Sequence, residues 1–358
     1  MIPIDVIRTA PDAVERSLRK RGDEAKLKLL SDILNKDKDW RSLITKLDAL
    51  RNQRNILTRQ VDETRKAKGD FKALIQEAKR TSDEIKEGEV LQNSLREDID
   101  RMLLKMPNLL HESVPEGRSE EDNVVVRTWG EPKKPSDELM HHGEFAVKMG
   151  LADFERAVKI SGAGFYMLKG PLALMDLALM RLAVDFLSGR GYVLVEPPLL
   201  MRQKPYEGVT DLGDFENVMY RIEGEDLYLI ATSEHPLAAM HMNEILEEQK
   251  LPLKYCGLSA CFRREIGKHG LDERGLFRVH QFSKIEQFIF CKIEDSWKFH
   301  EELIANAEEL TRMLGIPYRV VNVCTGDIGS VAAKKYDLEG WSPREGKYIE
   351  LMSCSNCT

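Results

Sequence analysis

Charged side chains interrupt two stretches of this sequence that otherwise have the pattern of β-strands. Arg263 and Glu265 lie two residues apart in the first stretch, and Arg278, Phe282 and Glu286 follow in the second. Successive side chains of a strand point to opposite faces, so each of these two sets is expected on one face. A guanidinium group holds a phosphate or a carboxylate group with paired hydrogen bonds. These residues therefore predict the binding of an anionic substrate.

The loop between the two stretches contains Gly267, Gly270 and Gly275 among several charges and is expected to close a hairpin. A hairpin brings the two faces together, with Phe282 as a flat surface for a nucleotide base and Glu286 as an acceptor for an ammonium group. The alternative is a ladder of cross-strand ion pairs on a solvated face, which is common in antiparallel sheets. That alternative does not explain an aromatic ring among the charges.

A second group of polar residues follows an apolar run in "DLYLIATSEHPLAAMHMNEILEEQ". The pattern predicts a strand, a polar turn and then a helix. Thr232 and Glu234 lie in the turn, and they share one face if the strand geometry continues through it.

Two neighbouring patterns predict elements that position these residues. "PLALMDLALMRLAVDFLSGRG" is typical of an amphipathic helix that ends at Gly189 or Gly191. "YVLVEPPLLMR" begins as a strand, which Pro197 and Pro198 end.

The N-terminal part has the pattern of helices. Pro11 is expected to begin a helix and Gly22 to end it. Residues 39–106 contain no proline and predict two long helices with a break near Gly69. Apolar residues recur there at steps of three and four, namely Trp40, Leu43, Leu47, Leu50, Leu57 and Val61, and then Leu74, Ala78, Ile85, Leu95, Ile99, Met102 and Met106. Two such stripes joined by a turn predict an antiparallel coiled-coil hairpin.

The hairpin is basic, whereas the rest of the chain is acidic. Between Arg41 and Arg80 there are 11 basic and 5 acidic residues, a balance of +6, so the remainder carries −13 to give the net charge of −7. A basic projecting hairpin is suited to the phosphate backbone of a nucleic acid. The alternative is a solvated coiled-coil surface, which accounts for most runs of charge.

Length and composition bound the remaining possibilities. A chain of 358 residues is expected to form more than one domain. Residues 107–140, with several prolines and glycines, predict a linker between an N-terminal domain (1–106) and a mixed α and β domain (141–358). No apolar run is long enough for a membrane span, no signal-peptide pattern is present, and six cysteines fit the cytoplasm. Cys354 and Cys357 form a CxxC without the second ligand pair of a usual zinc site.

Taken together, these motifs resemble the seryl-tRNA synthetases, a family of class II aminoacyl-tRNA synthetases. "CFRREIGKHGLDERGLFRVHQFSKIEQF" is similar to the family's motif 2, and "ATSEHPL" to its Thr-x-Glu serine-binding turn. The helix before "YVLVEPPLL" resembles the dimer-forming motif 1, and "NVCTGDIGSVAAKKYDLEGWSPREGKYIELMSCSN" the stretch towards motif 3. The implied fold class is α+β, with an N-terminal antiparallel coiled-coil arm and a class II antiparallel β-sheet flanked by helices.

The resemblance also implies a reaction, cofactors and partners. L-serine and ATP give seryl-adenylate, and the seryl group then passes to tRNA(Ser), with tRNA(Sec) as a further acceptor. ATP and Mg²⁺ are the implied cofactors. The implied N-terminal domain (1–106) binds tRNA through its arm, about residues 39–106, and the implied assembly is a cytoplasmic homodimer formed through motif 1.

Individual roles follow from the same resemblance. Arg263 and Glu265 are the implied catalytic residues, and Arg263 would hold the α-phosphate and the serine carboxylate as negative charge develops. Glu265 would hold the base region of ATP, Arg278 the γ-phosphate, and Phe282 would stack on adenine. The implied ATP site comprises Arg263, Arg264, Glu265, Arg278, Val279, Phe282, Glu350, Leu351, Met352 and Ser353. The implied serine site comprises Thr232, Ser233, Glu234, Arg263 and Glu286.

Glu350 and Ser353 are the residues that the resemblance places against Mg²⁺, which bridges the phosphates of ATP. Positions 350 and 353 fall on opposite faces of a regular strand. Their common role therefore predicts a bulge or a turn between them.

Members of the family continue past this point with motif 3, whose arginine binds ATP, whereas this sequence ends at Thr358. An incomplete catalytic domain is therefore expected. A truncated, non-catalytic tRNA-binding paralogue is one alternative, which the missing motif 3 favours and the intact site residues disfavour. A ligase that loads an amino acid onto a carrier protein is another, and the arm argues against it.

Overall fold

The computed structural model describes residues 2–136, 138–210, 218–265 and 275–357. The chain divides into two compact units, Met1–Leu109 and Leu110–Thr358.

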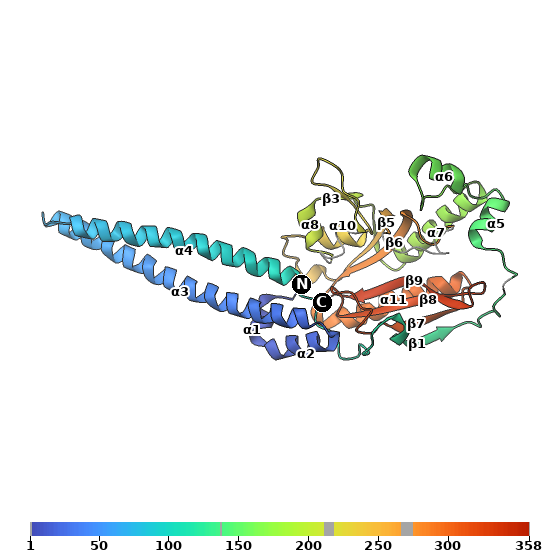
Figure 1. Ribbon diagram of the computed structural model, residues 1–358, viewed down its shortest axis with the longest axis horizontal. Coiled ribbons are helices and arrows are strands. Elements are labelled where there is room, and N and C mark those ends of the chain that lie inside the picture. Colours follow the sequence, from blue (N-terminus) through green and yellow to red (C-terminus); the bar gives the residue numbers. More distant parts are fainter. Residues whose placement is uncertain (1, 137, 211–217, 266–274, 358) are drawn as a thin grey trace. The chain divides into compact units, whose positions relative to one another are not determined.

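Helices make up the N-terminal unit (Figure 1). The predicted helix from Pro11 is confirmed, and it ends at Gly22, whose positive φ of 72° suits a glycine. The first long helix begins earlier than the predicted residue 39, because the Asp23 side chain accepts a hydrogen bond from Lys26 N and caps a helix at that point. The helices are α1 (Ile4–Thr9), α2 (Pro11–Arg21), α3 (Glu24–Lys66) and α4 (Lys72–Leu104).

The predicted apolar stripes of α3 and α4 face one another, as the two helices lie side by side in Figure 1. Leu47 and Leu57 of α3 and Ile85 and Ile99 of α4 are buried. Gly88 allows the helices to approach closely, because a Cβ atom there would lie 2.5 Å from Cδ2 of Leu47. At the base of the hairpin, buried apolar residues of the four helices and of their flanking segments form one core: Ile2, Ile7, Val14, Leu18, Leu30, Ile33, Ile99, Leu103 and Met106.

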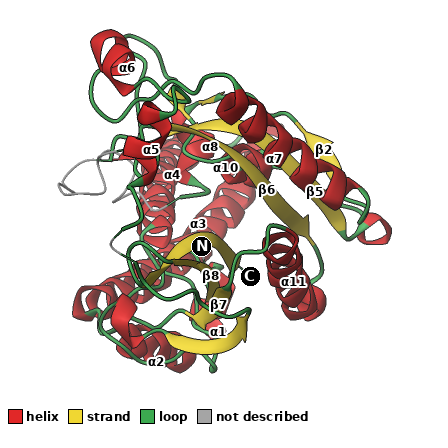
Figure 2. Cartoon of the chain, turned by 90° about the vertical axis from the view of Figure 1, so that its right-hand side faces the viewer, coloured by secondary structure: helices red, strands yellow, loops and turns green. Residues whose placement is uncertain are grey.

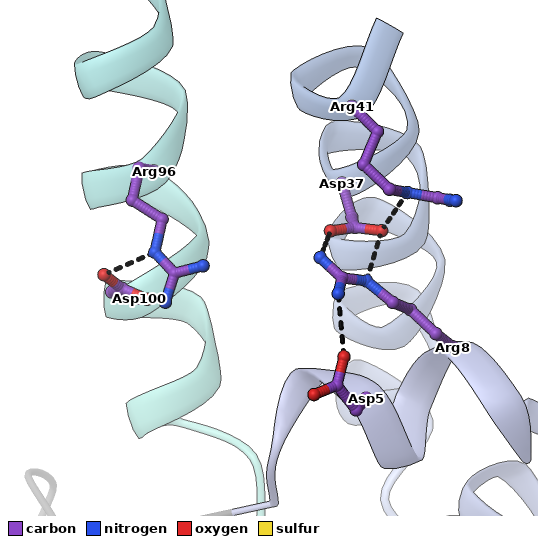
Figure 3. A network of polar contacts seen from close by, with 6 residues as sticks. All are labelled: Asp5, Arg8, Asp37, Arg41, Arg96 and Asp100. Carbon is purple, nitrogen blue, oxygen red and sulfur yellow. Dashed lines mark hydrogen bonds and ion pairs between the residues drawn. The ribbon is translucent and has the colours of Figure 1, made fainter. Parts of the chain in front are cut away.

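A buried carboxylate joins the short helix α1 to the hairpin. Asp37 of α3 is 1% exposed and accepts hydrogen bonds from Arg8 of α1 at 3.0 and 2.6 Å and from Arg41 at 2.9 Å (Figure 3). Arg8 also donates to Asp5 at 2.8 Å. The hydrogen bond from Arg8 is the main cause that lowers the pKa of Asp37.

The C-terminal unit contains two principal sheets. A four-stranded antiparallel sheet has the order β1-β7-β8-β9, and a three-stranded sheet has the order β2-β5-β6, with β2 parallel to β5. β3 (Leu200–Met201) and β4 (Tyr228–Leu229) form a separate short pair. The longer strands are β1 (Val124–Trp129), β2 (Val193–Val195), β5 (Leu253–Phe262), β6 (Gln281–Phe290), β7 (Tyr318–Asn322), β8 (Lys334–Ser342) and β9 (Lys347–Asn356).

Helices cover these sheets (Figure 2). The predicted amphipathic helix α7 packs Leu187 near Cys256 of β5, on one face of the three-stranded sheet, while α10 lies on the other face, beside Gly257. α11 packs Ile304 against the four-stranded sheet. Within the described residues, the helices of this unit are α5 (His142–Lys148), α6 (Phe154–Ser161), α7 (Pro171–Ser188), α8 (Gln203–Glu207), α10 (Glu234–Ala239) and α11 (Ser296–Met313), with 3-10 turns at Glu120–Asp122, Glu248–Lys250 and Ile293–Asp295. None of the helices in the described ranges has the length and apolarity that a membrane span requires.

Candidate active site

The β5–β6 hairpin carries the first group of candidate residues. The two strands pair antiparallel, with Gly257 opposite Glu286 and Cys261 opposite Phe282. Phe282 and Glu286 share one face of β6, as their spacing predicts. The guanidinium carbon of Arg263 lies 5.1 Å from the centre of the Phe282 ring. The cation and the aromatic surface that the sequence predicted are therefore adjacent.

The expectation that Arg263, Glu265 and Arg278 lie within the strands is wrong. β5 ends at Phe262 and β6 begins at Gln281, and Glu265 has a positive φ of 45°, which a strand does not allow. Arg263 N still donates to the carbonyl oxygen of His280 at 3.0 Å, and Arg278 pairs with Glu265 at 2.9 Å. Gly267 and Gly270 of the predicted loop lie outside the described residues.

The turn before α10 carries the second group. The strand geometry does not continue to Glu234, because α10 begins there and Glu234 N donates to the Thr232 hydroxyl oxygen at 3.2 Å. The Thr232 hydroxyl donates to Oε2 of Glu286 at 3.0 Å. Arg263 Nε donates to the carbonyl oxygen of Ala231 at 3.3 Å. The turn thus meets the hairpin at both Glu286 and Arg263.

Ser233 points to the sheet. It is fully buried, and its hydroxyl donates to the carbonyl oxygen of Gly257 at 3.4 Å. A Cβ atom at residue 257 would lie 2.7 Å from Ser233 Oγ and 2.8 Å from Cδ1 of Leu237. Glycine at this position therefore lets the turn and α10 pack directly on β5.

Lys284 lies between Phe282 and Glu286 on the same face of β6, and sequence reasoning missed it. Its Nζ atom lies 2.5 Å from Glu286 Oε2 and donates to Thr232 Oγ1 at 3.1 Å. Burial by itself lowers the pKa of Lys284, but the charges of Glu286 and Glu234, together with the hydrogen bond to Glu286, outweigh burial and raise that pKa. Burial, and then the charge of Glu286, raises the pKa of Glu234. Lys284 lies two residues from both Phe282 and Glu286, so the alternation of side chains along β6 places all three on the same face.

Tyr206 of α8 was also missed, because no local pattern links it to the turn. It is completely buried, and its hydroxyl oxygen accepts a hydrogen bond from Ala231 N at 3.1 Å. The same oxygen lies 2.9 Å from Nδ1 of His235. Burial, together with the charges of Lys284 and Arg263, lowers the pKa of His235 to about 3, so its imidazole is neutral. Tyr206 therefore fixes the turn on both sides of Thr232.

The third group lies on β8 and β9. Their register shifts between Leu338 and Glu339, where Leu338 pairs with Met352 and Glu339 with Glu350, so Leu351 is an extra residue in β9. This is the predicted bulge between Glu350 and Ser353.

The bulge places a hydroxyl between two carboxylates. Ser353 Oγ donates to Asp337 Oδ1 at 2.6 Å and lies 3.0 Å from Glu350 Oε1. Lys335 pairs with the other oxygen of Asp337 at 2.9 Å. Burial is the largest cause that raises the pKa of Asp337 to about 6. Asp337 was missed, because only the pairing of β8 with β9 brings it beside Ser353.

The remaining candidates have different surroundings. Arg264 N donates to the carbonyl oxygen of Val218 at 2.9 Å, and Val279 is buried. Leu351 is 45% exposed, whereas Met352 packs against the core under α11.

Cys354 follows Ser353 in β9. It is buried, and burial followed by the charges of Glu286 and Asp337 raises its pKa to about 12. Its thiol is therefore protonated at neutral pH. Among the described residues, no group of three or more His, Cys, Asp or Glu side chains is arranged to hold a metal ion by itself.

Comparisons with known proteins identify the two parts of the chain. The family described as "Seryl-tRNA synthetase N-terminal domain" matches residues 1–110, and "tRNA synthetase class II core domain (G, H, P, S and T)" matches residues 217–358. A serine–tRNA ligase of Methanocella arvoryzae is 56% identical over 358 residues, which are 100% of this chain and 84% of that protein.

Two solved structures are similar over the whole chain. Seryl-tRNA synthetase from Pyrococcus horikoshii, complexed with ATP, has a TM-score of 0.93 and 43% identity, covering 100% of this chain and 85% of that one. A cytoplasmic serine–tRNA ligase from Naegleria fowleri, complexed with AMP, has a TM-score of 0.89 and 35% identity, covering 100% and 86%. The chain belongs to the seryl-tRNA synthetases, ligases with a class II synthetase core.

Proposed function

We propose that this protein joins L-serine to tRNA(Ser), with tRNA(Sec) as a further acceptor, in two steps that consume ATP. The observation that carries the proposal is the meeting of Thr232, Glu234 and Glu286 beside Arg263 and Phe282. This group offers acceptors for an ammonium and a hydroxyl group next to a cation and an aromatic surface. Serine and ATP together present the complementary groups.

In the proposed serine site, Thr232, Glu234 and Glu286 surround the ammonium and hydroxyl groups of serine, and the Arg263 guanidinium holds its carboxylate. Glu286 is 14% exposed and Thr232 is buried, so hydrogen bonds made there are shielded from water. Ser233 contributes by fixing the turn to Gly257.

In the proposed first step, a serine carboxylate oxygen attacks the α-phosphorus of ATP, and the bond to the oxygen that bridges the α- and β-phosphates breaks. Pyrophosphate leaves with the bonding electrons. Arg263 neutralises the charge that develops on the α-phosphate. Arg278 holds the γ-phosphate and Glu265 the base region. Adenine stacks on Phe282, and the site extends over Arg264, Val279, Leu351 and Met352.

Glu350 and Ser353 are proposed to contact Mg²⁺ bound to ATP. The bulge of β9 brings a carboxylate and a hydroxyl group together beside Asp337, and oxygen atoms are the ligands that magnesium prefers. The donor set therefore fits this ion, which when bound neutralises phosphate charge.

The α3–α4 hairpin is proposed to bind tRNA. Basic side chains are exposed on its outer half: Arg59, Arg65, Lys66, Lys68, Lys72, Lys79 and Arg80. Such side chains neutralise backbone phosphates. In the second step a hydroxyl of the terminal ribose of tRNA attacks the acyl carbon of the adenylate, and AMP leaves. The arm disfavours transfer to a carrier protein.

A second copy of the chain is proposed to bind through α7 and β2 and so form a homodimer. The protein is proposed to act in the cytoplasm. Apolar side chains of these elements are exposed, among them Leu174 (67%), Leu177 (59%) and Val193 (59%). Large exposed apolar patches mark association surfaces. A Leu177→Asp variant is expected to shift the sedimentation of the protein towards a monomer.

Pyrophosphate exchange into ATP tests the proposal. Serine is expected to drive exchange, and alanine to drive it roughly 10⁴-fold less, because alanine leaves buried hydroxyl acceptors unpaired. Aminoacylation of tRNA(Ser) and of tRNA(Sec) tests the second step. Equal exchange with alanine would exclude the serine site, and the absence of any exchange would favour a tRNA-binding protein without catalysis.

A further inference from the structure

Lys284 contacts the same atoms that the proposed function assigns to serine. Its ammonium group lies 2.5 Å from Glu286 Oε2 and 3.1 Å from Thr232 Oγ1. The Thr232 hydroxyl in turn donates to that same Glu286 oxygen at 3.0 Å. The side chains of Lys284, Thr232 and Glu286 thus all contact one another. The ammonium group of Lys284 occupies the acceptors that are proposed to bind the ammonium group of serine.

Charge balance in the pocket depends on Lys284. Two carboxylates, Glu234 and Glu286, face the site, with Arg263 and Lys284 as the cations. Other titratable groups near them come from three elements: His235 of α10, Cys256 and Cys261 of β5, and Cys354 and Cys357 of the β9 segment. The imidazole of His235 is neutral, and burial raises the pKa of each of these thiols. No further cation therefore comes from this set when Lys284 is removed.

The protonation state of the carboxylates decides what the pocket recognises. An ionised carboxylate only accepts hydrogen bonds, whereas a protonated one also donates. Serine presents its ammonium and hydroxyl groups as donors. Two carboxylates that lack a shared cation repel one another, and one of them retains a proton to higher pH. Burial and the charge of Glu286 already raise the pKa of Glu234, and the charge of Lys284 acts against this rise. Removal of Lys284 would therefore favour a protonated carboxyl group, which donates where serine requires an acceptor.

We propose that Lys284 is a positioning residue that determines specificity for serine. Its ammonium group holds Thr232 and Glu286 in the arrangement that accepts the substrate, and its positive charge offsets the negative charge of the pocket carboxyl groups. This inference rests on the proposed function, and it adds to the serine site a residue that touches the substrate-binding groups.

Lys254 of β5 provides a matched control. It is also a lysine of the three-stranded sheet, 21% exposed compared with 33% for Lys284, and it pairs with Glu302 at 2.7 Å. Lys254 has no part in the proposed serine or ATP sites. A Lys254→Met variant therefore removes a comparable ion pair without altering the pocket.

The experiment compares the unaltered protein with Lys284→Met, Lys284→Arg and Lys254→Met. Pyrophosphate exchange is measured from pH 6 to 8.5, with KM for serine and KM for ATP determined separately, and with serine and alanine as substrates. Lys284→Gln replaces the methionine variant if circular dichroism shows that the latter is unfolded.

Lys284→Met is expected to raise KM for serine about tenfold at pH 8.5, with KM for ATP within about twofold of the unaltered protein. The loss should be larger at pH 6 than at pH 8.5, because a pocket carboxyl group that retains its proton no longer accepts a hydrogen bond from serine. The discrimination between serine and alanine should fall as well. Lys284→Arg retains the charge and should restore the pH profile.

Opposite results separate the two proposals. A lower KM for serine in Lys284→Met would mean that Lys284 competes with the substrate, and a profile equal to that of Lys254→Met would mean that it is only structural. Either result overturns the inference and leaves the serine site in place. Absence of serine-dependent exchange in the unaltered protein would instead overturn the proposed function.

Discussion

Ser353 Oγ lies 3.0 Å from Oε1 of Glu350, although residues three apart on a regular strand point to opposite faces. The extra residue, Leu351, reverses the alternation and brings the two side chains together beside Asp337. The β9 bulge thus creates an oxygen-lined group from residues that a flat strand would separate.

Ser353→Ala is expected to weaken the use of Mg²⁺ more than the use of serine. Removing one oxygen ligand should raise the Mg²⁺ concentration for half-maximal pyrophosphate exchange by about tenfold, which is about 1.4 kcal/mol. KM for serine should not change. Ser283→Ala, an exposed serine of β6, is the control. An unchanged Mg²⁺ requirement in Ser353→Ala would contradict the proposed role.

Tyr206→Phe is expected to damage the serine turn at a distance from the substrate. Without the hydroxyl, Ala231 N loses its acceptor in a buried place, which costs about 1–3 kcal/mol of unfolding free energy. The ratio kcat/KM for serine should fall about tenfold, corresponding to about 1.4 kcal/mol of lost transition-state binding, while KM for ATP stays constant.

Steady-state kinetics and urea unfolding measure these two effects. Tyr255→Phe, which loses a contact of 3.2 Å to His241, serves as the control. If Tyr206→Phe impaired the use of ATP as much as the use of serine, the variant would have damaged the whole site and not the serine turn alone.

Asp37→Asn is expected to destabilise the N-terminal unit in a pH-dependent way. It removes a buried acceptor from Arg8 and Arg41 and should lower the unfolding free energy at pH 7 by about 2–4 kcal/mol. The pKa of Asp37 is lowered in the folded protein, so its stabilising effect is complete above its ordinary value of 3.8 and is lost as pH falls through the folded value.

Urea unfolding followed by far-ultraviolet circular dichroism at pH 7, 5 and 3 checks this. The difference in unfolding free energy between the unaltered protein and Asp37→Asn should stay constant from pH 7 to pH 5 and become smaller below pH 3.8. A gap that widens in acid would contradict the assignment.

Neutralising the tip of the hairpin is expected to weaken tRNA binding in a salt-dependent way. Arg65→Gln combined with Lys66→Gln should lower affinity and reduce the slope of log K against log salt by about 1–2. Lys28→Gln combined with Lys38→Gln, at exposed positions nearer the base of α3, is the control. Equal slopes in both double variants would show that the tip is not a phosphate contact. Titration of labelled tRNA at several salt concentrations measures the slopes.

Local signals predicted local structure well. Pro11 and Gly22 bound α2, and the period of two places Phe282 and Glu286 on one face. The stripes of α3 and α4 include buried residues such as Leu47 and Ile85. Each of these features depends on neighbours within a few residues. The apolar stripe at Trp40 does not mark the start of α3, because the cap at Asp23 begins the helix before that stripe.

Features that depend on distant residues were not predictable. Tyr206 reaches Ala231 across 25 positions, and Ser353 reaches Asp337 across 16. β5 ends at Phe262, and Glu265 then has a left-handed backbone, a conformation that a glutamate rarely adopts and that its sequence does not signal. The alternation of side chains in β6 places Lys284 on the face of Phe282 and Glu286, but its partner Thr232 lies 52 positions away in the sequence.

The unbroken length of α3 sets how far the hairpin reaches. Its 43 residues span about 65 Å, since a helix rises 1.5 Å per residue. An insertion in one helix alone would change the register of the apolar stripe of α3 against that of α4. A helix presents the same face to its partner again after two turns, which is about seven residues. Natural changes in reach are therefore expected as paired insertions of about seven residues in both helices, each moving the tip by about 10 Å.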